Sequence, residues 1–116
     1  MSETEDCLFC KIASGEIQSS KIYEDDEVLA FNDISPVAPV HFLVIPKEHI
    51  GSCAEIDKDN SAIVAHIFEV ISLLAKQLEL DEGFRVVSNC GVKAGQSVMH
   101  LHFHVMAKRT FEWPAG

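Results

Sequence analysis

The stretch His100-Leu101-His102-Phe103-His104-Val105-Met106 alternates three histidines with apolar residues. A period of two is typical of a β-strand, so the three imidazole rings should share one face while Leu101, Phe103 and Val105 bury the other. Desolvated imidazoles cost free energy unless each has a partner. Since neutral imidazole can act as nucleophile, acid, base or metal ligand, this strand is the first place to look for a function.

The composition indicates a single globular domain spanning residues 1–116. The chain has 116 residues, of which 47% are hydrophobic, and its mean hydropathy is +0.13, which suffices for one core. Its formal net charge is −9, and Lys and Arg form no stripe, so nucleic acid and membranes are not expected partners. A phosphate-bearing substrate must then be held by local donors. Residues 1–6 are expected to be a disordered tip.

The polar, acidic start of the chain has no apolar segment of the kind found in signal peptides. No apolar run approaches the roughly 18 residues of a membrane span. Four cysteines in such a chain favour a reduced protein with a metal site over a disulfide framework. We therefore expect a cytoplasmic protein.

The hydrophobic pattern predicts an α+β protein in which an antiparallel sheet carries one long and one short helix. Strands are expected at 21–24, 27–31, 41–45, 84–88 and 101–108. A short helix capped by Asp6 should cover 7–14, and a long helix should run from Asn60 to about Leu80. Its apolar stripe consists of Ile63, Ile67, Val70, Ile71, Leu74 and Leu78.

Several polar residues are expected near the triple histidine. The run Gly95-Gln96-Ser97-Val98 lies just before it, and a glycine there lets backbone amides approach a ligand closely. Asn89 ends the preceding strand, and His41 opens another strand after a loop that contains Asp33. Together these residues form a candidate site.

A second motif, Cys7-Leu8-Phe9-Cys10, has the spacing with which two thiolates hold one tetrahedral zinc ion. A complete site needs two further ligands from elsewhere in the chain. The pair alone therefore indicates a metal site without fixing its other ligands.

The chain resembles the histidine triad (HIT) family, whose signature of three histidines alternating with apolar residues is matched in full by residues 100–106. Segments 31–36, 38–47 and 113–114 are similar to the branch of histidine triad nucleotide-binding proteins, the purine nucleoside phosphoramidases. The resemblance extends from about Cys7 to the end of the chain. It implies a HIT-like fold with a five-stranded antiparallel sheet, and a homodimer that joins two sheets into one.

The resemblance implies a hydrolase that binds purine nucleotides (AMP, GMP and their phosphoramidates). Such an enzyme cleaves nucleoside 5′-phosphoramidates at the α-phosphorus through a nucleotidyl-histidine intermediate. By this likeness His102 is the nucleophile, with a backbone carbonyl fixing its tautomer. His104 and His41 contact the phosphate and stabilise its charge, and Ser97 helps to protonate the departing amine.

The resemblance also assigns the residues that hold the substrate. Asp33 accepts hydrogen bonds from the ribose hydroxyls. The residues that contact the phosphate are Asn89, Gln96, Ser97 and His104. An apolar slot for the base is formed by Phe9, Ile12, Ile17, Phe31 and Ile34.

Some members of the wider superfamily bind zinc through an N-terminal cysteine pair, a histidine after the middle strand and the first histidine of the triad. The matching residues here are Cys7, Cys10, His49 and His100. A closed site of two thiolates and two imidazoles has no open position. The resemblance therefore implies a structural Zn²⁺ ion that ties the N-terminal helix to the catalytic strand.

Three other functions stay open. The chain could be a dinucleoside polyphosphate hydrolase, a nucleotide-binding regulatory module with incidental catalysis, or a metallohydrolase with His102 and His104 as zinc ligands. Outside the motifs, His66 is interpreted as a surface or satisfied histidine, and Cys53 and Cys90 as free buried thiols.

Overall fold

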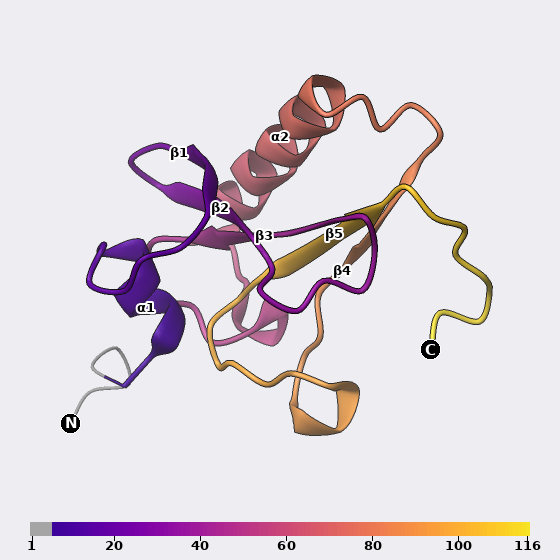
Figure 1. Cartoon of the computed structure of the whole chain (residues 1–116). Helices are drawn as coiled ribbons and strands as arrows, with labels where there is room; N and C mark the ends of the chain where they lie inside the picture. Colours follow the sequence, from indigo (N-terminus) through magenta and orange to yellow (C-terminus); the bar gives the residue numbers. More distant parts are fainter. Residues whose placement is uncertain (1–5) are drawn as a thin grey trace.

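A computed structural model describes residues 6–116 (Figure 1). It contains two α-helices, α1 (Leu8–Ala13) and α2 (Ser61–Gln77), and two short 3₁₀ turns, η1 (Cys53–Glu55) and η2 (Val92–Ala94). The strands are β1 (Lys21–Glu24), β2 (Val28–Asn32), β3 (Val40–Pro46), β4 (Phe84–Val87) and β5 (Phe103–Ala107). Apart from exposed Asp6, the tip predicted to be disordered lies outside the described residues. Within 6–116, neither helix has the length and apolarity to cross a membrane.

The five strands form one antiparallel sheet in the order β1-β2-β3-β5-β4, which confirms the predicted α+β fold class. Strand β3 lies between β2 and β5, and six of its seven residues are buried. Burial on both faces explains its nearly continuous hydrophobicity. Strand β5 pairs with β3 from Val40 and Ala107 to Val44 and Phe103, so the histidine-bearing strand is also central.

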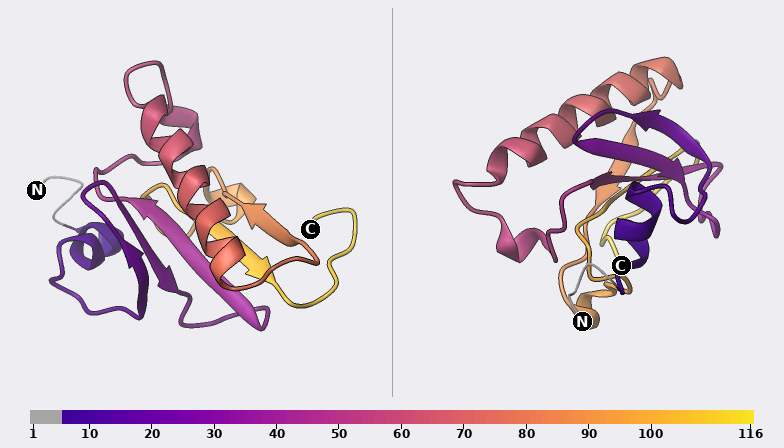
Figure 2. Two further views of the ribbon diagram at one scale, coloured as in Figure 1. Left: turned by 90° about the horizontal axis from the view of Figure 1, so that it is seen from above. Right: turned by 90° about the vertical axis from the view of Figure 1, so that its left-hand side faces the viewer.

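Different helices cover the two faces of the sheet (Figure 2). The buried stripe of α2 packs in one core with Leu101, Phe103 and Val105. Helix α1 packs in a second core on the opposite face, where Phe9 contacts the rings of the first two triad histidines. The predicted alternation of the triad is therefore confirmed, with apolar residues facing α2 and imidazoles on the side of α1.

The histidine strand begins later than predicted. Strand β5 starts at Phe103, so the first two histidines of the triad precede the ladder. The physical reason is Pro46, which ends β3 and has no N–H to offer a partner strand. The N–H of Leu101 donates to the carbonyl of Ile50 instead, at 2.6 Å.

Helix α2 ends earlier than predicted, at Gln77 instead of about Leu80. Glu79 adopts a left-handed conformation with φ 57°, and the Leu80 N–H donates to the carbonyl of Ala75. This is the closing bond of a Schellman motif, formed here without glycine. It turns Leu80 into the core and leaves Leu78, a member of the predicted stripe, 39% exposed.

Helix α1 is capped by Cys7 instead of the predicted Asp6. The Sγ atom of Cys7 accepts a hydrogen bond from the Cys10 N–H at 3.3 Å. The thiol takes the capping role because it lies over the first turn of the helix, where N–H groups have no partner. Both cysteines of the pair are thereby fixed at this short helix.

The turn between β1 and β2 is built on Asp25. Its Oδ1 accepts the N–H groups of Glu27 and Val28, both at 2.8 Å, which delays the start of β2 from the predicted Glu27 to Val28. Its Oδ2 accepts the Tyr23 hydroxyl at 2.7 Å and pairs with His66 Nε2 at 2.6 Å. His66 therefore joins α2 to the edge of the sheet.

This pair should make stability depend on pH. Hydrogen bonds to Asp25 and Glu69 raise the pKa of His66. The pair therefore stabilises the fold fully below the ordinary histidine pKa and loses its effect as the pH rises through the raised value. We expect His66→Gln to lower the free energy of unfolding by about 1 kcal/mol at about pH 6 and by almost nothing at about pH 9. Denaturant unfolding at both pH values measures the difference.

Glu69→Gln is the matched control, because this partner side chain is 75% exposed and should change stability by less than about 0.5 kcal/mol. An equal loss for His66→Gln at both pH values would contradict the role given to the charge.

Candidate active site and metal cluster

His102 is held in one tautomer by the backbone. Its Nδ1–H donates to the carbonyl oxygen of His100 at 2.7 Å, so the lone pair of the neutral ring lies on Nε2. The residue is 4% exposed, and its ring meets Phe9 edge-on with centroids 5.0 Å apart. Burial lowers the pKa of His102, although the carbonyl and the charge of Asp33 oppose this. A neutral imidazole in this tautomer can act as a nucleophile.

His41 and His104 form a hydrogen-bonded pair beside this ring. The Val37 N–H donates to His41 Nδ1 at 3.1 Å, so neutral His41 carries its proton on Nε2. This Nε2–H donates to His104 Nδ1 at 2.9 Å, which leaves the proton of His104 on its own Nε2. The hydrogen bonds thus run from Val37 through His41 to His104. They end at the Nε2–H group of His104, which is a suitable donor to an anionic oxygen.

Asp33 lies against the pair, with Oδ2 3.5 Å from His41 Nε2 and 3.9 Å from His104 Nδ1. The three side chains have the spacing of a metal site. A neutral His41 that accepts from Val37 at Nδ1, however, has no lone pair on Nε2 for a metal. The cluster is therefore better described as a hydrogen-bonded network. Burial, followed by the proximity of His102 and His41, lowers the pKa of His104.

The four residues predicted to hold zinc come together. Cys7 Sγ lies 3.3 Å from His100 Nδ1, and Cys10 Sγ lies 3.2 Å from His49 Nδ1 and 3.4 Å from His100 Nδ1. All four ligand atoms lie within 4.8 Å of one another. Tetrahedral zinc, with Zn–S of about 2.3 Å and Zn–N of about 2.0 Å, separates sulfur from nitrogen by about 3.5 Å. The cluster thus has the spacing of a metal site.

The protonation of the cluster also suits a metal. His100 Nε2–H donates to the carbonyl of Pro46 at 2.8 Å, so its lone pair on Nδ1 faces the sulfur atoms. Burial lowers the pKa of His100 to about 4, which keeps the ring neutral. Burial and the neighbouring Cys7 raise the pKa of Cys10 to about 12. A cation would therefore be needed to make Cys10 a thiolate ligand.

The loop between β4 and β5 is fixed by Gln96, which is 4% exposed. Its Oε1 accepts the Gly91 N–H at 2.8 Å, and its Nε2 donates to the carbonyls of Gly51 at 2.8 Å and Val98 at 3.0 Å. The side-chain amide thus ties the loop to the segment after β3. Ser97, the next residue, is exposed beside it.

Asn89, another predicted phosphate contact, follows β4 and lies over Gly95. A Cβ atom at Gly95 would be 3.7 Å from Asn89 Nδ2, and the φ of 102° at Gly95 favours glycine. The turn at Gly95 therefore brings Asn89, at the start of this loop, close to the part of the loop that carries Ser97.

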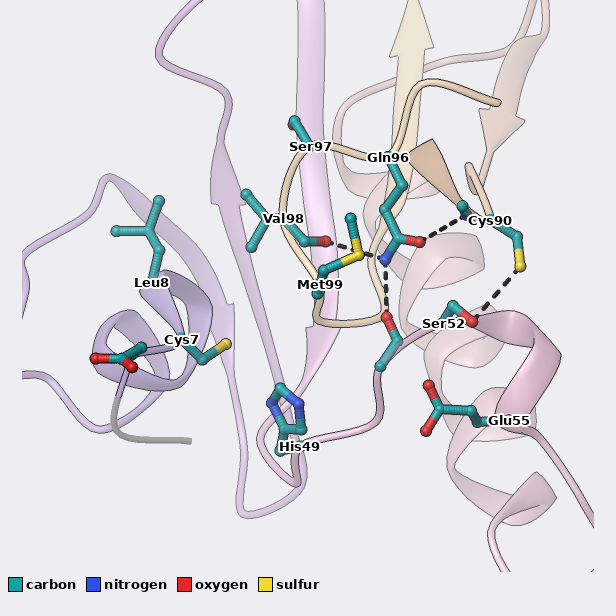
Figure 3. A pocket seen from close by; sticks show the side chains of 13 residues that line it. Cys7, Leu8, His49, Ser52, Glu55, Cys90, Gln96, Ser97, Val98 and Met99 are labelled. Atoms are coloured by element: carbon teal, nitrogen blue, oxygen red, sulfur yellow. Dashed lines mark hydrogen bonds between the residues drawn. The ribbon is translucent and has the colours of Figure 1, made fainter. Parts of the chain in front are cut away.

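A cavity of about 840 Å³ lies next to this loop (Figure 3). It borders the cluster of Cys7, Cys10, His49 and His100 at Cys7 and His49, and the loop at Cys90 and Ser97. Among the described residues that line it, none is a triad histidine. The nucleophile predicted from the sequence, His102, is therefore not part of the lining of this cavity.

The predicted base slot is divided between core and surface. Phe9 and Ile12 of α1 and Phe31 of β2 are buried in one core, and the rings of Phe9 and Phe31 are 5.6 Å apart between centroids. Ile17 is 37% exposed and Ile34 is 99% exposed. The structure thus places Phe9 against His102 and leaves Ile17 and Ile34 at the surface.

Backbone groups are the functional partners that sequence reasoning misses. The Pro46 carbonyl and the Val37 N–H set the tautomers of the rings they contact. Any residue can supply a carbonyl and any residue except proline an N–H, so no sequence signal marks these groups. The prediction that Cys53 and Cys90 are buried is wrong. Cys53 is exposed because it lies on the η1 turn, and Cys90 is half-buried because it lies on the loop after β4, where it lines the cavity.

Comparison with known proteins identifies the family. The family model described as "Scavenger mRNA decapping enzyme C-term binding" matches residues 6–113. A 14 kDa zinc-binding protein of Brassica juncea is 45% identical over 113 residues, which cover 96% of this chain and 100% of that protein. The structure of a HIT family hydrolase from Legionella pneumophila Philadelphia 1 is similar with a TM-score of 0.93 and 43% identity, covering 96% of this chain and 100% of that one. The chain belongs to the histidine triad (HIT) family.

A more distant HIT structure shows the same fold. The histidine triad nucleotide-binding protein of Candida albicans has a TM-score of 0.80 and 37% identity, covering 96% of this chain and 85% of that one. The HIT-like fold and the family resemblance expected from the sequence are thus confirmed.

Replacing Gln96 tests how the loop of this HIT protein is held. In Gln96→Met, a change of similar size, Gly91, Gly51 and Val98 each lose a hydrogen-bond partner, and we expect a loss of about 2 kcal/mol in the free energy of unfolding. Denaturant unfolding measures this loss. Ser97→Ala is the control and should stay within about 0.5 kcal/mol of wild type. Unchanged stability of Gln96→Met would show that these bonds do not hold the loop.

Proposed function

We propose that this HIT protein hydrolyses purine nucleoside 5′-phosphoramidates at the α-phosphorus through a nucleotidyl intermediate on His102. The observation that carries the proposal is the 2.7 Å bond from His102 Nδ1–H to the His100 carbonyl. It leaves a lone pair on Nε2 of a neutral ring whose centroid is 5.1 Å from that of His104. The names of two relatives, a hydrolase and a nucleotide-binding protein, support the proposal.

In the first step, the Nε2 lone pair of His102 forms a bond to phosphorus as the bond from phosphorus to the amine nitrogen breaks. The N–H of His104, at the end of the donor chain, stabilises the negative charge that grows on the phosphate oxygens. The His102 ring becomes cationic, which the His100 carbonyl and the Asp33 carboxylate favour. Water then attacks the phosphorus, so that the nucleoside monophosphate leaves and His102 is restored.

The loop after β4 supplies the remaining phosphate contacts in this proposal. Asn89 and Ser97 donate to phosphate oxygens, and the Ser97 hydroxyl helps to protonate the departing nitrogen. Gln96 contributes through the loop, since its side-chain amide is bonded to three backbone groups. Local donors of this kind suit a protein with a net charge of −9.

The nucleoside lies at the other end of the proposed site. Asp33, whose side chain is 17% exposed, accepts hydrogen bonds from the ribose hydroxyls. The inner wall of the base slot is formed by Phe9, Ile12 and Phe31, and its exposed rim by Ile17 and Ile34. An apolar slot holds the base by burial and stacking, and therefore discriminates little between adenine and guanine.

The β4 edge supports the homodimer that we include in the proposal. In the described sheet, β4 pairs only with β5, and its Phe84 is 41% exposed. The opposite edge, β1, carries the charged residues Lys21 and Glu24 and a break in register, features that discourage strand pairing. Two β4 edges are therefore the better candidates to meet and join two sheets.

We further propose that the cluster of Cys7, Cys10, His49 and His100 holds a structural Zn²⁺ ion. The spacing and tautomers of the cluster support this, as does the name of the Brassica zinc-binding protein. When bound, the ion would supply a four-coordinate crosslink without an open position for substrate. The residues would then join α1, the segment after β3 and the start of the triad.

Trapping tests the nucleophile. Quenching the enzyme during turnover of a slow adenosine phosphoramidate should leave the nucleotidyl group on His102, as mapped by mass spectrometry. His102→Ala should abolish this label and lower kcat/KM at least about 1,000-fold. The control, His66→Ala on α2, should keep full turnover.

A label on any residue other than His102 would overturn the assignment. A strong preference for a diadenosine polyphosphate over adenosine phosphoramidate would instead favour a dinucleoside polyphosphate hydrolase.

Metal analysis tests the cluster. The purified protein should hold about one zinc ion per chain, and Cys10→Ser should remove it and lower the Tm by roughly 10 °C. Cys53→Ser, outside the cluster, should keep the metal. Chelation should lower the Tm before turnover is lost, and an immediate loss of turnover in folded protein would argue against a structural role.

A further inference from the structure

Cys53 and Cys90 are neighbours outside the metal cluster. Cys53 begins η1, whereas Cys90 belongs to the loop after β4 and lines the cavity beside Ser52 (Figure 3). The Cys90 thiol donates to Ser52 Oγ at 3.5 Å, and the same Oγ accepts the Ala54 N–H at 3.3 Å. Cys90 thus contacts the residue before Cys53, and the two thiols are close enough for each to influence the ionisation of the other.

The two thiols are accessible and differ in acidity. Cys53 is exposed, and Cys90 is half-buried on the cavity wall. When Cys90 ionises, the Ser52 hydroxyl can donate to the thiolate, and this bond lowers the pKa of Cys90. Partial burial of the sulfur and the neighbouring Cys90 raise the pKa of Cys53. An accessible thiol with more thiolate character reacts faster with oxidants, and an adjacent thiol can resolve the product.

We propose that Cys90 and Cys53 form a reversible oxidation site that closes to a disulfide at the cavity rim, with hydrogen peroxide as oxidant. The Cys90 thiolate attacks the peroxide, so that an S–O bond forms, the O–O bond breaks and hydroxide leaves. The Cys53 thiol then attacks the sulfenic sulfur, the S–S bond forms, the S–O bond breaks and water leaves. Two thiols lose two electrons in total, and hydrogen peroxide is reduced to two water molecules.

The disulfide would act on the loop that carries Asn89 and Ser97. In the reduced protein this loop is already tied to the segment before η1 by the bond from Gln96 to Gly51. A covalent bond of about 2.05 Å draws Cys90, and with it the adjacent Asn89, toward η1. We expect lower turnover in the oxidised protein; this consequence rests on the proposed function, whereas the disulfide itself does not.

Trypsin makes the test direct, because it separates the cysteines into three peptides. Cys7 and Cys10 fall in peptide 1–11, Cys53 in 48–58 and Cys90 in 86–93. After the metal-loaded protein is treated with hydrogen peroxide, non-reducing peptide mapping should find 48–58 joined to 86–93. Dithiothreitol should separate them. A monomer band on a non-reducing gel should show that the bond lies within one chain.

Three variants give the matched controls. Cys53→Ser should prevent the crosslink and leave a sulfenic acid on Cys90 that dimedone captures. Cys90→Ser should slow the oxidation of Cys53 about tenfold, and Ser52→Ala should slow that of Cys90 several-fold. Peptides 48–58 and 86–93 that stay separate in oxidised wild-type protein, or a link only to peptide 1–11, would overturn the proposal.

Turnover of adenosine phosphoramidate is measured on the same samples. A several-fold loss on oxidation that dithiothreitol reverses, present in wild type and absent in Cys53→Ser, would support control of the site by the disulfide. Unchanged turnover in fully crosslinked protein would overturn that control. If the reduced protein does not hydrolyse the substrate at all, the proposed function fails while the peptide map still decides the oxidation site.

Discussion

One buried hydrogen bond, from His100 Nε2–H to the Pro46 carbonyl, holds the two parts of the site in place. It directs the Nδ1 lone pair of His100 toward the thiols of Cys7 and Cys10. The carbonyl of the same residue accepts the Nδ1–H of His102. The residue that completes the cluster therefore also selects the tautomer of the proposed nucleophile. Because the bond is buried, its strength is greater than it would be in water.

Burial, more than net charge, sets the electrostatics around the triad. A protein with a net charge of −9 has no general attraction for phosphate, and burial lowers the pKa of both His102 and His104. Neutral rings in fixed tautomers meet an anion with oriented N–H groups instead of with full charges. Donors fixed in advance need no rearrangement when negative charge grows on the ligand, which is the condition for strong electrostatic stabilisation.

Local patterns predict much of this molecule, and long-range bonds account for the rest. Alternation predicts the faces of the triad because side-chain direction in an extended chain is a local property, and the family resemblance names the four residues of the metal cluster. The ends of elements depend on distant partners: Pro46 delays the start of β5, and Leu80 turns into the core through a left-handed Glu79. The prediction that Cys53 and Cys90 are buried also fails. It rests on the general preference of cysteine for burial, which does not show which loops of a fold stay accessible to solvent.

The short segment 46–51 contacts the cysteine–histidine cluster, the start of the triad and the loop after β4. The carbonyls of Pro46, Ile50 and Gly51 accept hydrogen bonds from the first triad histidine, the residue after it and the loop glutamine, and His49 belongs to the metal cluster. An inserted or deleted residue here would displace cluster, nucleophile and loop together. Chain length in this segment is therefore constrained more tightly than side-chain identity, since three of its contacts use carbonyl oxygens that any residue supplies.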